Sequence, residues 1–278
     1  MYIFQDYDWV QLPFNMQTES DETYLIMTDT HGYFDMASAL YERIDKQHCK
    51  KIHLGDVTDR GSQNYKSMKF VRDNFDIRLF GNHDAFINQA LMGNHHGYMI
   101  WSWNGGDTVL SEFGINVDEL EEMVQESGGY FFQIWPEIFK ILVKNIPQDF
   151  QEFFIDGFQN YHGDGNILFI HAGLNPSMSV KSFLLKTVFD GCNLNLKDEV
   201  ENHWFWIRNP FLYSVDWEEK YLDDNKNPLF VFHGHTPQRD VYETSYRFCV
   251  DGGSYYNKQM FGVILEKDRY KVTVIQDR

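Results

Sequence analysis

Residues 24–32 read YLIMTDTHG, residues 51–61 read KIHLGDVTDRG and residues 77–84 read IRLFGNHD. Each segment begins as a short apolar run, like a buried strand, and ends in residue types that can bind a metal ion. Helix-like stretches at 36–47 and 65–74 separate the three segments. This order predicts parallel strands joined by crossover helices, and therefore an α/β fold.

The spacing of the polar ends supports the parallel arrangement. The steps from Asp29 to Asp56 and from Asp56 to Asn82 are 27 and 26 residues, close to the length of a strand, its crossover helix and the next strand. Ligands of open α/β sheets bind outside the carboxyl ends of the strands, so we expect the three loops to meet. Two later apolar runs, at 167–170 and 229–232, also end in histidines.

Residues 93–161 differ from the first part of the chain, because helix-like segments at 118–125 and 131–144 carry many aromatic residues. We interpret residues 93–161 as a helical insertion that packs against the core sheet. A lid or a wall of the substrate site is the alternative.

The end of the chain alternates apolar and polar residues as strands do, at 246–250, 262–265 and 271–275. This pattern predicts a second sheet packed on the first. Residues 1–22 form an N-terminal extension to which no role is assigned. A chain of 278 residues is within the reach of one large α/β unit, so we predict a single domain over 1–278.

Composition excludes several classes of protein. With 43% hydrophobic and 17% aromatic residues, the chain can bury a core and is not intrinsically disordered. The net charge of −17 repels phosphate backbones, so we expect no stable binding to nucleic acid. The acidity reflects either a solvated surface or carboxylates gathered for cations. The sequence does not indicate an oligomeric state.

The three cysteines, Cys49, Cys192 and Cys249, lie far apart and form no CxxC pair. They therefore suggest neither a disulfide framework nor a thiolate zinc site, and a reducing, cytoplasmic location fits them. We expect no export signal and no association with a membrane, because the first residues lack a basic and apolar leader and no run of 18 apolar residues occurs.

Five short motifs follow the apolar runs: DTHG at 29–32, GDVTDRG at 55–61, GNHD at 81–84, HAGL at 171–174 and GHTP at 234–237. A single Asp or His at a strand end is usually a cap, a turn residue or a surface group. Five such motifs in order, each at the end of an apolar run, make coincidence improbable and point to one shared site.

The residue types in these motifs suit a centre of two divalent cations. Asp29 and His31 are two residues apart in an extended segment, so both side chains can bind one cation. The carboxylate of Asp56 can bridge two cations. Oxygen and imidazole ligands without thiolate suit Mn²⁺, Fe or Zn²⁺, of which we prefer Mn²⁺. The donors assigned to the second cation are neutral: Asn82, His171 and His235.

Two cations about 3.5–4 Å apart can lower the pKa of a bridging water and hold both ends of an in-line displacement at phosphorus. The hydroxide so formed would attack directly, without a covalent intermediate. We expect His83 to give a proton to the leaving oxygen, with Asp59 orienting its imidazole. Arg60 and Arg208 would clamp the phosphoryl oxygens, together with Asn82.

These motifs resemble those of the metallophosphoesterases, in particular the phosphoprotein phosphatase family of serine/threonine phosphatases and its bacterial and phage relatives. The resemblance runs from about residue 29 to residue 253. It implies the calcineurin-like fold, in which two mixed β-sheets pack as a sandwich flanked by helices. The family motifs place metal ligands at Asp29, His31, Asp56, Asn82, His171 and His235, the proton donor at His83, and the Asp-Arg pair of the second motif at Asp59 and Arg60.

Two further segments resemble bacterial members of this family. Residues 206–208 (WIR) resemble an element whose arginine binds substrate phosphate. Residues 103–108 (WNGGDT) resemble a loop of the branch that includes symmetric dinucleoside tetraphosphatases. We assign the loop at 103–108 no catalytic role and interpret it as a turn that depends on glycine.

We therefore predict a metal-dependent phosphatase that hydrolyses phosphomonoesters, foremost phosphoserine and phosphothreonine in proteins, and small aryl phosphates besides. A dinucleoside polyphosphate hydrolase is the alternative, because that group shares the metal ligands and the His-Ala-Gly motif. It commonly replaces the aspartate that Asp59 represents here. A catalytically silent binding protein is a third hypothesis, although silent relatives usually lose ligands and none is missing.

Other histidines remain outside the predicted site. His233 precedes His235 by two residues and could be a further ligand, but a strand-end histidine bonded to the backbone explains it equally well. Three histidines in polar or glycine-rich loops are given no metal role: His95, His96 and His162.

Overall fold

The three apolar segments of the N-terminal half form neighbouring parallel strands. In the computed structural model, which describes residues 1–13, 16–45, 47–186, 203–213, 229–242 and 244–278, these strands are β3 (Thr23–Met27), β4 (Cys49–His53) and β5 (Ile77–Arg78). Helices α1 (Phe34–Arg43) and α2 (Asn64–Asn74) connect them. The predicted order of strands and crossover helices is confirmed.

The first sheet is completed from both ends of the chain. Its strand order is β1-β11-β10-β3-β4-β5, and β2 also pairs with β11. The contacts of β10 with β3 and of β11 with β1 are antiparallel, so the sheet is mixed. The added strands are β1 (Tyr2–Asp6), β2 (Val10–Gln11), β10 (Gln259–Glu266) and β11 (Arg269–Asp277).

The expectation that the C-terminal strands build the second sheet is wrong for two of the three. β10 and β11 belong to the first sheet, where Val263 of β10 lies opposite Ile26 of β3. The reason is visible in the burial of β10, in which every residue from Gln259 to Leu265 is buried. A strand covered on both faces lies in the interior of a sheet, whereas alternation indicates a half-exposed strand.

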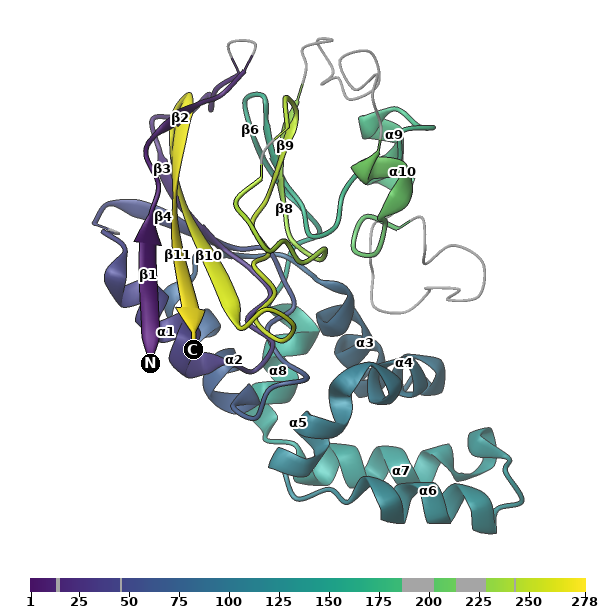
Figure 1. Ribbon diagram of the computed structural model, residues 1–278. Coiled ribbons are helices and arrows are strands. Elements are labelled where there is room, and N and C mark those ends of the chain that lie inside the picture. The colour runs from purple at the N-terminus through teal and green to yellow at the C-terminus, as the bar shows by residue number, and fades with distance from the viewer. Residues whose placement is uncertain (14–15, 46, 187–202, 214–228, 243) are drawn as a thin grey trace.

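The second sheet has the order β6-β7-β8-β9 and is also mixed, with an antiparallel pair β6-β7 and parallel strands after it. The two sheets pack face to face (Figure 1). The ring of Tyr24 in β3 lies 5.2 Å from that of Phe169 in β7, and Tyr270 of β11 lies 5.1 Å from Phe248 of β9. The strands are β6 (His162–Asp164), β7 (Ile167–Phe169), β8 (Phe230–His233) and β9 (Arg247–Cys249).

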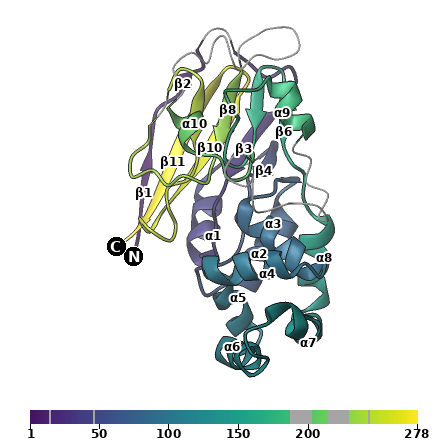
Figure 2. The same ribbon diagram turned by 90° about the vertical axis from the view of Figure 1, so that its right-hand side faces the viewer.

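Residues 93–161 are largely helical, as predicted. The side-chain amide of Asn88 in α3 donates to the carbonyl of Phe154 in α8, and the buried helical residues share one core with Leu25 and Met27 of the first sheet. The pair α6 and α7 lies farthest from the sheets in both views (Figures 1 and 2). The helices are α3 (Asn82–Leu91), α4 (His95–Trp101), the π-turn η1 (Ser102–Gly106), α5 (Asp107–Glu112), α6 (Val117–Glu126), α7 (Phe131–Asn145), α8 (Gln148–Asp156), α9 (Val180–Lys186) and α10 (Asn209–Leu212).

The N-terminal extension is partly ordered as sheet. β1 forms the edge of the first sheet, with Phe4 opposite Ile275, and β2 pairs with the other end of β11. The assignment of one domain to residues 1–278 stays a prediction. Within the described segments of the chain, no helix combines the length and the apolar character that crossing a bilayer requires.

Candidate metal centre

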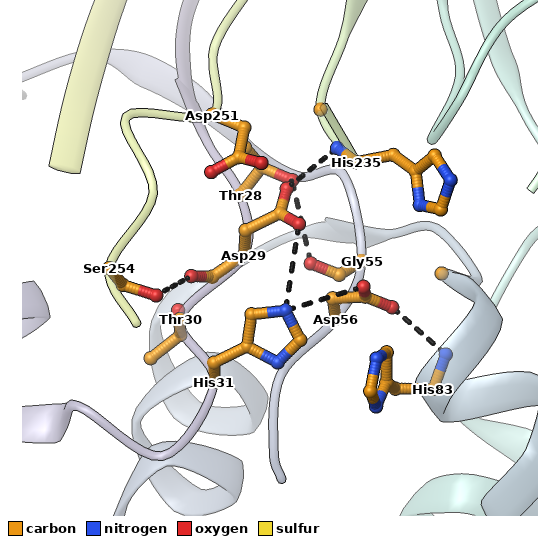
Figure 3. Close-up of polar contacts among 12 residues, drawn as sticks. Thr28, Asp29, Thr30, His31, Gly55, Asp56, His83, His235, Asp251 and Ser254 are labelled. Atoms are coloured by element: carbon orange, nitrogen blue, oxygen red, sulfur yellow. Dashed lines mark hydrogen bonds and ion pairs between the residues drawn. The ribbon is translucent and has the colours of Figure 1, made fainter. Parts of the chain in front are cut away.

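The loops that follow β3, β4, β7 and β8 meet at the start of α3, as the spacing of the motifs predicted. Figure 3 shows Asp29, His31, Asp56, His83 and His235 gathered from separate loops, with the ring of His31 directed at the carboxylates of Asp29 and Asp56. Nε2 of His31 lies 3.5 Å from an oxygen of Asp56 and 3.8 Å from an oxygen of Asp29. All five side chains are buried. Residues far apart in the sequence are therefore gathered around one carboxylate, that of Asp56.

Two groups of potential ligands share this carboxylate. One consists of His31, Asp56 and His83 and the other of Asp56, His171 and His235; within each group the ligand atoms lie within 4.8 Å of one another. His171 Nε2 is 3.4 Å from Asp56. The sixth predicted ligand also lies here, since the amide oxygen of Asn82 is 3.2 Å from His171 Nε2. The two groups of potential ligands are therefore joined through the Asp56 carboxylate.

Backbone carbonyls orient the three predicted histidine ligands. A carbonyl oxygen only accepts, so the ring nitrogen beside it carries the proton and the other nitrogen keeps a lone pair for a cation. Nε2 is thus available for a cation in His31 and His171, and Nδ1 is available in His235. The contacts are His31 Nδ1 to Thr58 O at 3.0 Å, His171 Nδ1 to Leu54 O at 2.9 Å and His235 Nε2 to Trp206 O at 3.1 Å.

The backbone of the motif loops is held in an unusual conformation. Nine described non-glycine residues have φ in the left-handed region, and six of them lie in the predicted motifs. Such residues are uncommon and cluster where a site imposes them. The six are Asp29 (49°), His31 (46°), Asp56 (56°), Asp59 (76°), Arg60 (66°) and His235 (68°).

The electrostatics of the centre favour a cation. Burial, with repulsion from Asp56, raises the pKa of Asp29 to about 6 and that of Asp84 to about 7. Burial and Asp29 raise the pKa of Asp251 well above its usual range. Burial alone would lower the pKa of His171, but the negative charge of Asp56 outweighs it and raises the pKa to about 9. Crowded, buried carboxylates beside imidazole and amide donors fit divalent cations.

A hydrogen-bonded chain adjoins the ligands. Nδ1 of His83 donates to an oxygen of Asp59 at 2.6 Å, and the indole of Trp101 donates to the other oxygen at 2.9 Å. All three side chains are fully buried. Burial raises the pKa of Asp59, while the bonds from His83 and Trp101 oppose the rise. His83 is therefore held by Asp59, although its position would also allow it to act as a ligand.

The two predicted phosphate-binding arginines line the same cavity. Arg60 donates from Nη2 to Nε2 of His83 at 3.0 Å, and Arg208 donates to the carbonyl of His235 at 3.4 Å. The cavity also includes Asn82 and has a volume of about 30 Å³, enough for about two or three water-sized groups. It is thus sized for small ions.

Comparison with known proteins agrees with this site. The sequence model of the calcineurin-like phosphoesterases matches residues 23–274. The chain belongs to that family. Members use divalent metals, and the donor groups around Asp56 are where this phosphoesterase could hold them. The N-terminal extension, residues 1–22, lies before the matched region.

Two solved structures of phosphatases have a similar fold. The cold-active protein-tyrosine phosphatase of a psychrophile, Shewanella sp., is 18% identical with a TM-score of 0.56, over 91% of this chain and 80% of that one. A protein serine/threonine phosphatase from Saccharomyces cerevisiae is 15% identical with a TM-score of 0.50, over 92% of this chain and 77% of that one. None of the curated proteins compared matches this phosphoesterase in sequence.

The sequence analysis missed the part played by Asp84. Its carboxylate accepts the backbone N–H groups of Asp56 at 2.7 Å, Val57 at 3.1 Å and Gly81 at 2.9 Å, and so ties the second motif to the start of α3. An acidic residue at the third position of a helix after an apolar run was the available signal.

Asp251 was missed as well. It lines the cavity and follows the buried strand β9, repeating the pattern of apolar run and acid found in the first motifs. Ser254, three residues later, donates to the backbone carbonyl of Asp29 at 2.7 Å (Figure 3). The loop after β9 thus forms the wall of the cavity next to Asp29.

The interpretation of His233 as a backbone-bonded histidine is supported. Its Nδ1 bonds to the carbonyl of Gly234 at 3.0 Å, and Arg247 donates to its Nε2 at 3.2 Å. Both ring nitrogens are therefore engaged away from Asp56. Three other histidines belong to neither donor group found among the described residues: His95, His96 and His162.

Proposed function

We propose that this phosphoesterase is a phosphomonoesterase that removes phosphate from phosphoserine and phosphothreonine in proteins. The observation that carries the proposal is the position of His83. It is bonded to Asp59 and lies within 4.8 Å of the ligand atoms of His31 and Asp56. A side chain that could donate a proton thus lies beside the proposed metal ligands, and hydrolysis of an ester with a poor leaving group requires such a donor.

The ligand residues divide between two divalent cations. Asp29 and His31 would hold one, and Asp56 would contact both. When bound, the cations supply positive charge to the phosphoryl oxygens and lower the pKa of water. We propose Mn²⁺, with Fe or Zn²⁺ as alternatives, because carboxylate, amide and imidazole donors suit these ions. The remaining ligands would hold the second cation: Asn82, His171 and His235.

His83 would act as the general acid. With Nδ1 donating to Asp59, only Nε2 can carry a proton toward the leaving oxygen. Nε2 accepts from Arg60 in this structure, so Arg60 would have to turn to the phosphoryl oxygens before His83 acts. Arg60 and Arg208 line the same cavity, and their planar guanidinium groups can each hold two phosphoryl oxygens. Asn82 would contribute its side-chain amide.

Dinucleoside polyphosphate hydrolysis is the second candidate, since the metal ligands and the motif that begins at His171 suit it equally. The retained Asp59, bonded to His83 and Trp101, favours a monoester. The complete set of ligands argues against a silent binding protein.

Activity toward defined substrates tests the proposal. With Mn²⁺ present, we expect turnover of p-nitrophenyl phosphate and of a phosphoserine peptide, and strong loss in Asp56→Asn and His83→Ala. Asp240→Asn, an exposed residue outside the cavity, is the matched control. Unchanged rates in both site variants would refute the assignment. If only diadenosine tetraphosphate, or only a phosphotyrosine peptide, is cleaved, that compound's class would replace phosphoserine and phosphothreonine as the substrate class.

The described cysteines agree with the proposed cytoplasmic location. Cys49 and Cys249 are free, buried thiols, as a reducing compartment would keep them. Cys192 lies outside the described residues.

A further inference from the structure

A second cavity lies in the helical region, away from Asp56. It is formed between α4, η1, α6 and α7 and has a volume of about 370 Å³, within the range of pockets that bind ligands. We refer to it as the helical groove. Its lining is mainly apolar and aromatic, and includes Tyr98, Met99, Trp103, Val117, Leu120 and Val124.

The helical groove is open to solvent and its apolar wall is unusually accessible. The indole of Trp103 is 77% exposed. A large exposed aromatic side chain in the wall of a groove is typical of a contact surface, because its apolar area is removed from water only when a partner covers it.

The charge on one wall indicates the chemistry of that partner. Helix α6 reads VDELEEMVQE and has no basic residue. Glu121 lines the helical groove and Glu122 follows it on the exposed side. Within the described part of the chain, no carboxylate of α6 forms an ion pair, and Glu119 accepts a hydrogen bond from Asn116. A partner that brings Lys or Arg next to apolar side chains would complement both features.

The helical groove is connected to the candidate catalytic residues through a single segment. Helix α4 carries Tyr98 and Met99 in the groove wall and Trp101, whose indole donates to Asp59 at 2.9 Å. In η1, Trp103 lines the groove, and two residues later the carbonyl of Gly105 accepts the N–H of Arg60 at 3.1 Å. A ligand in the helical groove therefore contacts the segment that supports the Asp-Arg pair.

We propose that the helical groove binds a segment of the phosphoprotein substrate in which basic residues flank apolar ones. The identification of the occupant as substrate rests on the proposed function; the binding chemistry rests on the groove alone. Such a segment would hold the substrate near the cavity at Asp56, so it would lower KM more than it raises kcat.

Binding is measured first, with an unphosphorylated, fluorescein-labelled peptide in which single leucines alternate with pairs of lysines. We expect saturable binding that weakens with added salt. Two peptides test the chemistry: replacing each leucine by serine, or each lysine by glutamate, should abolish binding. Because this assay needs no turnover, its failure is separate from failure of the phosphatase proposal.

Glu121→Lys and Glu122→Lys form a matched pair, since both are exposed, lie on the same helix and change the net charge equally. We expect Glu121→Lys to weaken peptide binding at least tenfold and Glu122→Lys to have a much smaller effect. Val124→Ser, which removes groove surface without a charge, should also weaken binding. Hydrolysis of p-nitrophenyl phosphate should stay unchanged in all three variants.

A phosphoserine peptide that carries the basic and apolar segment should show the same loss in kcat/KM for Glu121→Lys, mainly through KM. Equal effects of Glu121→Lys and Glu122→Lys would reduce the binding to general charge attraction and overturn the proposal. Peptide binding without any phosphatase activity would overturn the identification of the occupant as substrate. Self-association abolished by Val124→Ser, without peptide binding, would show that a second copy occupies the groove instead.

Discussion

The carboxylate of Asp59 lies 2.6 Å from Nδ1 of His83, and both side chains are buried. The contact joins the last part of the second motif to the third, 24 residues later. A carboxylate in this position fixes the tautomer of the imidazole, so that its other nitrogen faces the cavity.

Asp59→Asn should therefore lower kcat by about 10²- to 10⁴-fold, the usual contribution of a general acid or base. The loss should be greater for phenyl phosphate, whose leaving group needs a proton, than for dinitrophenyl phosphate, whose leaving group does not. Steady-state kinetics with both esters measures the difference. If kcat falls equally for the two esters, Asp59 has a structural role and does not assist proton transfer.

Trp101→Phe should have a similar but smaller effect than Asp59→Asn. It keeps an aromatic ring in the core but removes the hydrogen bond to Asp59. One hydrogen bond to a charged group contributes about 1.5–3 kcal/mol, so a smaller loss of kcat with the same dependence on leaving group is expected. A loss equal for both esters would argue against coupling through Asp59.

Removal of metal should destabilise the protein, and more so at high pH. The pKa values of Asp29 and Asp84 are raised to about 6 and about 7, chiefly by burial. A carboxyl whose folded pKa exceeds its unfolded value stabilises the fold at low pH, and that stability is lost as pH rises through the folded pKa. Cation binding also strengthens as ligands lose protons.

We therefore expect the Tm difference between metal-loaded and chelated protein to be larger at about pH 8 than at about pH 5.5. Thermal denaturation with and without chelator at each pH measures it. A difference that is constant or shrinks with pH would contradict the assignment of Asp29 to a cation site.

Gly105→Ala should impair catalysis through Arg60. Gly105 has φ +105°, and a Cβ there would lie 2.9 Å from Cγ of Arg60. Gly114 is a matched control, with φ +71° and nothing within 4 Å of its added Cβ. Both substitutions should cost about 1 kcal/mol of stability from backbone strain.

Only Gly105→Ala should lower kcat/KM for p-nitrophenyl phosphate, by about tenfold, because a misplaced binding group costs about that much or more. Denaturant unfolding and steady-state kinetics separate the two effects. If Gly105→Ala and Gly114→Ala retain equal activity, the loop at 103–108 does not position Arg60.

His203 should make the protein sensitive to mild acid. Burial lowers its pKa to about 3, and Nδ1 has no hydrogen-bond partner among the residues that the structure describes. The unfolded chain therefore takes up the proton first as pH falls below about 6.5, and the free energy of unfolding decreases by about 1.4 kcal/mol per pH unit until the folded pKa is reached.

His203→Phe keeps a ring against Phe205, whose centroid lies 3.9 Å from that of His203. Between about pH 6.5 and pH 5 the wild type should lose about 2 kcal/mol more than the variant. Urea unfolding of both at each pH makes the comparison, and shared contributions of the metal site cancel in the difference. Parallel pH profiles would place His203 in contact with water.

Much of the site could be predicted from the sequence. The apolar runs before Asp29, Asp56 and Asn82 identified strands, and their even spacing placed the loops at one sheet edge. The structure gathers the predicted ligands around Asp56. What periodicity could not assign was the sheet to which each C-terminal strand belongs. Strand β10 pairs with β3, more than 200 residues away, because its residues are buried on both faces.

The sequence alone determined which kinds of side chain reach the cavity. The apolar run that forms each strand and the donor residues that follow it are neighbours in the chain, so both can be recognised locally. Only the tertiary structure decided how each donor is oriented. The nitrogen that His171 offers depends on the carbonyl of Leu54, 117 residues earlier in the chain. Beside burial, the raised pKa of Asp251 likewise depends on Asp29, from the opposite end of the sequence. Such contacts arise when two sheets pack, since burial brings together groups that no local pattern connects.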